Sequence, residues 1–91
     1  MTADNRPSMP SQRVRVVAQQ AAGKWVLLDV DSGRYFALDE VGGRIWHLCD
    51  GSRTVDEIAA VIASEFDGDA TAVAVDVAAL VSELSGESLL A

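Results

Sequence analysis

The sequence has few of the features that mark secreted, disulfide-bonded or membrane-spanning proteins. Its one cysteine, Cys49, cannot form an internal disulfide, and no apolar run approaches the roughly 20 residues needed to cross a bilayer. Residues 1–12 are polar, contain two prolines and lack the apolar core of a secretory signal. We therefore expect a cytoplasmic protein without a membrane span. We also expect a flexible lead-in at 1–12 and a single domain at 13–91.

Positive charge is absent from the last two-fifths of the chain. All seven Lys and Arg residues lie between Arg6 and Arg53, and the formal net charge is −7. From Thr54 onward every charged residue is acidic. Such a surface repels the phosphate backbone of nucleic acids and attracts basic peptides. The alternative explanation is that the acids serve solubility alone.

The first half of the sequence alternates with the period of β-strands. Residues 13–18 predict a half-buried strand, in which Val14, Val16 and Ala18 share one face. Residues 24–30 and 34–38 predict two further strands. The connections at 20–23 and 31–33 both contain the glycine typical of hairpin turns. The prediction is a three-stranded antiparallel meander.

The second half changes to the period of helices. Asp39 is placed to cap a helix that continues to about Cys49, and Thr54 with Glu57 forms a capping box for a second helix. A third helix is predicted from residue 70 to about residue 85, capped by Asp69. The predicted buried positions of the three helices are Val41, Ile45 and Leu48; Val55, Ile58, Ala59, Ile62 and Phe66; and Val73, Val77, Leu80 and Leu84. Leu89 and Leu90 are expected to fold back onto the core. Strands followed by helices predict an α+β fold.

Residues that could carry catalysis or bind a metal are nearly absent. His47 and Cys49 are two positions apart on a predicted helix, so their side chains point about 200° apart and cannot share a proton. A helix-end histidine and a half-buried cysteine are the simpler interpretation. One His and one Cys cannot form a zinc or iron site. We therefore predict a protein that is not an enzyme and needs no cofactor.

The second and third predicted helices have helix-turn-helix proportions, which raises the possibility of a transcriptional regulator. A recognition helix normally carries Arg or Lys for phosphates and Arg, Asn or Gln for base edges. The predicted third helix contains none of these residues. Nucleic-acid binding is therefore disfavoured.

The segment YFALDEVGGRIW at 35–46, followed by LCDG at 48–51 and TVDEI at 54–58, resembles the PqqD-like family of peptide-recognition domains. The resemblance implies a winged-helix-like domain that binds the leader segment of a ribosomally made precursor peptide. Tyr35 and Trp46 look most like the stand-alone proteins of lasso-peptide biosynthesis, which deliver the leader to a cysteine-protease-type leader peptidase. The LCDG segment also resembles the pyrroloquinoline quinone chaperone, which presents its precursor to a radical enzyme. A purely structural subunit is a further alternative.

The resemblance implies that the leader lies antiparallel along the third strand and against the third helix. The third strand is short, and a free edge would let a peptide add a strand there. On a helical wheel the third helix has an apolar stripe beside acidic residues, which suits a leader with apolar and basic side chains. A free edge also allows either a monomer or a weak homodimer. The predicted peptide-binding residues are Arg34, Tyr35, Phe36, Ala37, Leu38, Asp76, Val77, Leu80, Val81, Glu83 and Leu84.

Overall fold

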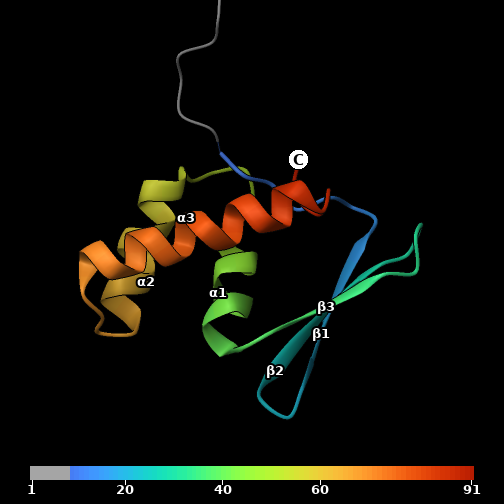
Figure 1. Ribbon diagram of the computed structural model, residues 1–91, viewed down its shortest axis with the longest axis horizontal. Helices are drawn as coiled ribbons and strands as arrows, with labels where there is room; N and C mark the ends of the chain where they lie inside the picture. The colour runs from blue at the N-terminus through green and yellow to red at the C-terminus, as the bar shows by residue number, and fades with distance from the viewer. Residues whose placement is uncertain (1–8) are drawn as a thin grey trace, which may run out of the picture.

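The computed structural model describes residues 9–91, and in it three antiparallel strands precede three helices (Figure 1). This order confirms the predicted α+β fold. No helix among the described residues is both long and apolar enough to span a membrane. The elements are β1 (Val16–Ala21), β2 (Lys24–Asp29), β3 (Tyr35–Leu38), α1 (Glu40–Leu48), α2 (Val55–Glu65) and α3 (Ala70–Gly86).

The strands form one sheet in the order β1-β2-β3, with both pairs antiparallel. Ala22 and Gly23 connect β1 to β2 with positive φ angles of 52° and 77°, as expected for the mirror-image turns that match strand twist. Gly33, with φ of 75°, serves the second connection. The predicted meander is therefore confirmed.

The start of β1 differs from the prediction. Val14 is fully exposed, and the strand begins at Val16 and continues through Ala21. The N–H of Arg13 donates to the carbonyl of Leu89, and the N–H of Val16 donates back to the carbonyl of Arg13. The second bond closes a turn at 13–16 and the first joins that turn to the C-terminal tail. Arg13 and Val14 therefore do not continue the sheet, although the carbonyl of Arg15 still accepts from the N–H of Val30.

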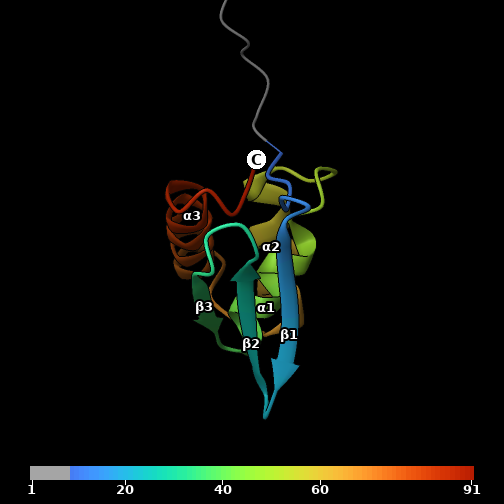
Figure 2. The ribbon, with the colours of Figure 1, turned by 90° about the vertical axis from the view of Figure 1, so that its right-hand side faces the viewer.

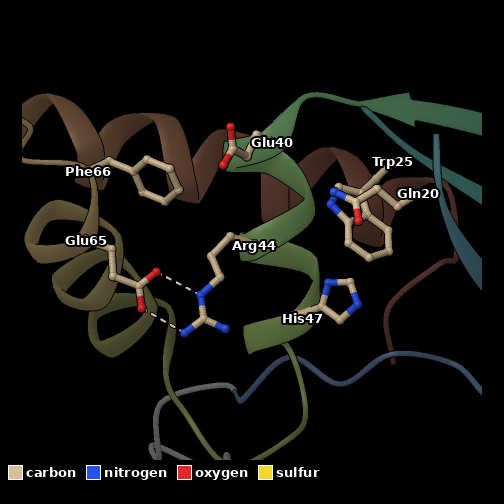
Figure 3. A pocket seen from close by; sticks show the side chains of 7 residues that line it. All are labelled: Gln20, Trp25, Glu40, Arg44, His47, Glu65 and Phe66. Carbon is tan, nitrogen blue, oxygen red and sulfur yellow. Dashed lines mark hydrogen bonds and ion pairs between the residues drawn. The ribbon is translucent and has the colours of Figure 1, made fainter. Parts of the chain in front are cut away.

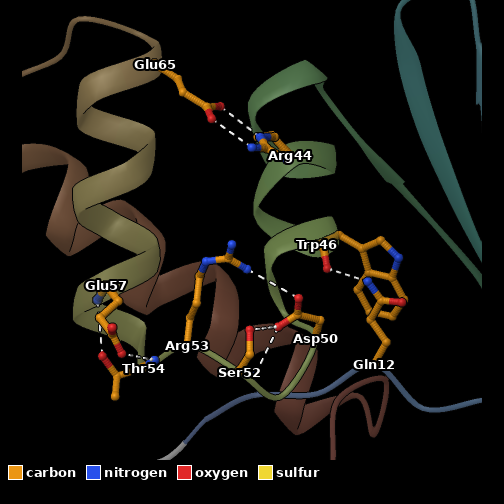
Figure 4. A network of polar contacts seen from close by, with 9 residues as sticks. All are labelled: Gln12, Arg44, Trp46, Asp50, Ser52, Arg53, Thr54, Glu57 and Glu65. Atoms are coloured by element: carbon orange, nitrogen blue, oxygen red, sulfur yellow. Dashed lines mark hydrogen bonds and ion pairs between the residues drawn. The ribbon is translucent and has the colours of Figure 1, made fainter.

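The predicted lead-in is only partly within the described structure, since residues 1–8 lie outside it. Residues 9–12 are tied to the domain, which differs from the flexible segment expected there. Ser11 and Gln12 form β-bridges with Asp50 and Leu90. The side-chain amide of Gln12 also donates to the carbonyl of Trp46 at 2.7 Å (Figure 4). The segment therefore joins the end of α1 to the C-terminal tail.

All three helices begin at the residues that the sequence predicted. The Asp39 carboxylate accepts from the N–H of Gly42 at 2.7 Å, and the Asp69 carboxylate accepts from the N–H of Thr71 at 2.9 Å. Thr54 and Glu57 form the complete reciprocal capping box (Figure 4). Each cap satisfies N–H groups that have no partner inside the helix.

The core lies where the helices meet the inner face of the sheet. The largest fully buried side chain of the core is Trp46. Leu89 folds back onto the core as predicted. The predicted buried position at Phe66 is wrong: Phe66 is the C-cap of α2 and is 39% exposed. Cys49 is completely buried rather than half-buried.

The buried face of α3 is rotated relative to the predicted stripe. Val77 and Leu84 are buried as predicted, but the third buried residue is Val81, whereas Val73 and Leu80 are half-buried. α3 packs mainly on α2 and lies on the same side of the molecule as β3 (Figure 2). This placement leaves Leu80 facing the space between α3 and β3.

Gly43 allows α1 to approach the sheet. A Cβ atom at Gly43 would lie 1.9 Å from Cδ1 of Trp25 on β2, a distance that no side chain tolerates. The close neighbour of Gly43 is thus the indole ring of Trp25. Glycine costs roughly 1 kcal/mol relative to Ala inside a helix, and the packing of Trp25 offsets that cost.

Candidate functional site

The outer edge of β3 carries backbone groups without a strand partner in the described structure. β3 pairs with β2 alone. The N–H of Asp29 donates to the carbonyl of Arg34 at 2.9 Å, which makes this opposed pair a hydrogen-bonded one. Because such pairs alternate along an antiparallel ladder, the N–H and C=O groups of Tyr35 and Ala37 point away from β2. They are available for an added strand.

A groove of about 450 Å³ adjoins this edge. One wall is the end of β3 with the turn into α1, and the opposite wall is α3. Val41 and Ile45 on α1 and Leu80 on α3 supply the branched apolar side chains away from the strand. The complete lining is Ala37, Leu38, Asp39, Val41, Gly42, Ile45, Asp76, Leu80 and Glu83.

The rim of the groove is acidic. Asp76 and Glu83 project from α3, and Asp39 lies on the opposite side. All three residues are exposed, and the described lining contains no Lys or Arg. A peptide with basic side chains would therefore meet complementary charge along most of the groove.

An ion pair connects the two walls beyond the groove. Arg34, immediately before β3, donates from Nη2 to Glu87 Oε2 at the end of α3, 2.6 Å away. The Arg34 guanidinium also lies over the Phe36 ring, 5.3 Å from its centroid. α3 and β3 run in opposite directions (Figure 1), so this pair marks the end of the groove opposite to Asp39 and Asp76.

The predicted peptide-binding residues fall into three groups. Ala37, Leu38, Asp76, Leu80 and Glu83 are brought together as groove lining. Val77, Val81 and Leu84 are buried beneath α3 in the core, where they support the groove but present little surface to a peptide. Of the others, Tyr35 is 72% exposed, Phe36 is half-buried on the inner face, and Arg34 closes the groove end.

Sequence reasoning missed the contribution of α1 to this groove. Asp39, Val41, Gly42 and Ile45 all line it. The helical spacing of Val41 and Ile45 was visible in the sequence, but it indicates only a shared face. Whether that face meets the core or a groove depends on where α3 packs.

A second hollow, of about 470 Å³, lies on the other side of α1 (Figure 3). Arg44 spans it with a two-pronged ion pair to Glu65 on α2, at 2.8 and 2.7 Å. The rings of Trp25 and His47 contact each other in a tilted arrangement, with centroids 4.5 Å apart and planes at 60°. This hollow is not adjacent to the free β3 edge, since β1 and β2 supply its sheet residues.

Two titratable side chains on and beside α1 make contacts within the fold. Burial raises the pKa of Cys49 to about 11, so the thiol stays protonated at neutral pH. Nδ1 of His47 lies 2.7 Å from the carbonyl of Gly43. No group of three or more His, Cys, Asp or Glu side chains suited to a metal ion occurs within residues 9–91.

Four carboxylates have lowered pKa values. The side-chain and backbone hydrogen bonds of Ser52 lower the pKa of Asp50, and the hydrogen bonds from Thr54 do so for Glu57. The Arg44 guanidinium lowers the pKa of Glu65. For Asp29, burial alone would raise the pKa, but hydrogen bonds from the Asp31 backbone and the Arg15 side chain outweigh it.

The fold agrees with the comparison to known families. The family model described as coenzyme PQQ synthesis protein D (PqqD) matches residues 24–90. The chain belongs to the PqqD family. A curated PqqD-family relative, the PqqA binding protein of Xanthomonas euvesicatoria pv. vesicatoria (strain 85-10), is 36% identical over 92 residues. The match covers 99% of this chain and 98% of the relative.

Three solved structures share this PqqD-family fold. TbiB1 in complex with the TbiA(β) leader peptide is 32% identical, with a TM-score of 0.76 and coverage of 88% of this chain and 93% of that one. Lasso peptide synthetase B1 complexed with its leader peptide is 25% identical, with a TM-score of 0.79 and coverage of 92% and 99%. The PqqD truncation of Methylobacterium extorquens PqqCD represents a stand-alone RiPP recognition element. It is 27% identical, with a TM-score of 0.71 and coverage of 90% and 87%. The chain thus has the fold of a leader-peptide recognition element.

Proposed function

We propose that this protein binds the leader segment of a ribosomally synthesised precursor peptide and presents it to a maturation enzyme. The leader adds a strand antiparallel to β3 and places alternate side chains in the groove against α3. The observation that carries the proposal is the juxtaposition of the free β3 edge with an apolar, acid-rimmed groove. In this role the protein binds and positions its peptide, and another protein performs the chemistry.

The free energy of leader binding comes mainly from side chains buried in the groove. The outward N–H and C=O groups of Tyr35 and Ala37 provide four hydrogen bonds, worth about 1 kcal/mol each. These bonds are offset by an association cost of at least about 4 kcal/mol. Leader side chains buried against Val41, Ile45 and Leu80 contribute about 1.5–3 kcal/mol each. Two or three such side chains give an affinity near micromolar, which corresponds to about −8.2 kcal/mol.

We assign the leader to a lasso-peptide precursor and the recipient to a cysteine-protease-type leader peptidase. Tyr35 and Trp46 in the β3–α1 segment favour this assignment. It is also supported by the similarity to two leader-peptide complexes, with TM-scores of 0.76 and 0.79. The second candidate is presentation of PqqA to a radical enzyme in pyrroloquinoline quinone biosynthesis. The similarity to PqqA binding proteins over nearly the whole chain favours that candidate.

Titration with two labelled peptides tests the proposal and separates the candidates. The probes are the TbiA(β) leader and PqqA, and each has a control peptide of the same composition in scrambled order. The lasso assignment predicts near-micromolar binding of the TbiA(β) leader, weaker binding of PqqA and no binding of either scrambled peptide. Tighter binding of PqqA would favour the second candidate. Equal binding of native and scrambled peptides would contradict leader recognition altogether.

A further inference from the structure

Arg34 uses less of its guanidinium than Arg44 or Arg15. Arg44 engages both oxygens of Glu65, and Arg15 bonds both Asp29 and the carbonyl of Ser88. The Arg34 side chain makes one hydrogen bond within the described residues, from Nη2 to Glu87. Because a guanidinium carries five N–H donors in a planar fork, Arg34 retains donors for a second carboxylate.

The position of Arg34 makes those donors accessible to a peptide on the β3 edge. Its side chain is 60% exposed, and stacking over the Phe36 ring holds the guanidinium near the strand. It directly precedes Tyr35, whose outward backbone groups are the last ones available at this end of β3. A peptide that continues beyond Tyr35 therefore passes the guanidinium.

The charges at the two ends of the groove are different. Asp39 and Asp76 lie at the end where β3 enters α1, whereas Arg34 and Glu87 lie at the other end. A leader antiparallel to β3 has its N-terminal part beside the acids, and its C-terminal continuation leaves past Arg34. The groove thus distinguishes the two directions of a peptide by charge.

We infer that Arg34 is a specificity-determining residue that binds a carboxylate of the leader, shared with or exchanged for Glu87, just C-terminal to the leader residues paired with β3. This inference rests on the proposed function and specifies the leader chemistry at one end of the groove. The recognised class is an Asp or Glu side chain following the apolar anchors. A charge-assisted hydrogen bond at an exposed site changes affinity by about two- to five-fold.

A charge panel on the peptide tests the inference. Each position of the TbiA(β) leader, or of PqqA if that is the probe that binds, is replaced in turn by Asp, Asn and Lys. With the native protein, one position C-terminal to the β3-paired residues is expected to favour Asp over Asn by about two- to five-fold, with Lys weakest. Arg34→Glu should reverse this order at that position alone. Glu87→Gln should strengthen the preference for Asp, because it removes the competing carboxylate.

Arg53→Glu is the matched control, since Arg53 is a partly exposed arginine with a single ion pair among the described residues, to Asp50, in the connection between α1 and α2 (Figure 4). It makes the same charge change and should leave the order of the panel unchanged. Thermal unfolding checks that each variant is folded. An equal effect of Arg34→Glu at every position, or the same reversal with Arg53→Glu, would overturn the inference. If the native protein binds neither leader, the proposed function fails and the inference with it. If the native protein binds a leader but no leader position changes its preference in Arg34→Glu, the inference is overturned and the proposed function stands.

Discussion

Replacing Leu80 with Ala distinguishes a groove residue from a core residue, because Leu84→Ala is the same chemical change one turn later on α3. Leu84 is 2% exposed in the core, so Leu84→Ala should lower the free energy of unfolding by about 2–5 kcal/mol. Leu80 is half-buried and lines the groove. A bound leader would cover the remaining exposed part of the Leu80 side chain, and burying that part contributes about 1 kcal/mol to binding.

The expected result is therefore a reciprocal pattern. Leu80→Ala should weaken leader binding about five-fold, since 1.4 kcal/mol corresponds to a factor of ten, and should cost less stability than Leu84→Ala. Leu84→Ala should leave the affinity of the folded fraction unchanged. Urea unfolding and peptide titration on the same samples measure both quantities. Unchanged affinity in Leu80→Ala, with a stability loss equal to that of Leu84→Ala, would refute the groove assignment.

Three further predictions concern packing, charge and pH. Gly43→Ala should destabilise the fold by about 1–3 kcal/mol through collision with Trp25, although Ala is the better helix former. Gly86→Ala is the control, because an added Cβ there meets no atom within 4 Å, and it should not destabilise the fold. A higher unfolding temperature for Gly43→Ala than for the native protein would contradict the packing of Gly43 against Trp25. Asp76→Asn with Glu83→Gln should weaken binding of a basic leader by about 0.2–1 kcal/mol, and affinity that does not change with salt would confine these acids to solubility. The four carboxylates with lowered pKa values stabilise the fold above the ordinary carboxyl pKa near 4. That stabilisation is lost as the pH falls through the lowered pKa values of the folded state. The urea concentration at the unfolding midpoint should therefore decrease once the pH is below about 4. A midpoint that stays constant from pH 6 to pH 3 would contradict the assigned hydrogen bonds.

Local signals in the sequence were sufficient for most element boundaries. Asp39, Thr54 and Asp69 begin helices because their side chains satisfy N–H groups in the first turn. The glycine-containing turns fixed the meander, because positive φ angles require such residues. The groove was predictable in outline, since a three-stranded meander leaves β3 at an edge and α3 carries an apolar stripe beside acids.

Features that depend on how the elements pack could not be predicted in the same way. α3 is rich in Val and Ala around much of its circumference, so the sequence does not distinguish a stripe containing Val81 from one containing Leu80. Phe66 continues the apolar period of α2, yet the helix ends there and leaves the ring exposed. The strand pattern at Val14 is interrupted by hydrogen bonds to the C-terminal tail, which no local window contains.

Ala37→Pro is a direct test of strand addition at the β3 edge. The N–H of Ala37 points away from β2, so proline removes a donor that the fold itself does not use, and proline is tolerated at such edge positions. If the leader pairs with β3, Ala37→Pro remains folded but loses leader binding. Phe36→Pro instead removes a donor to β2 and should destabilise the sheet. Wild-type leader affinity in a folded Ala37→Pro variant would contradict strand addition at β3.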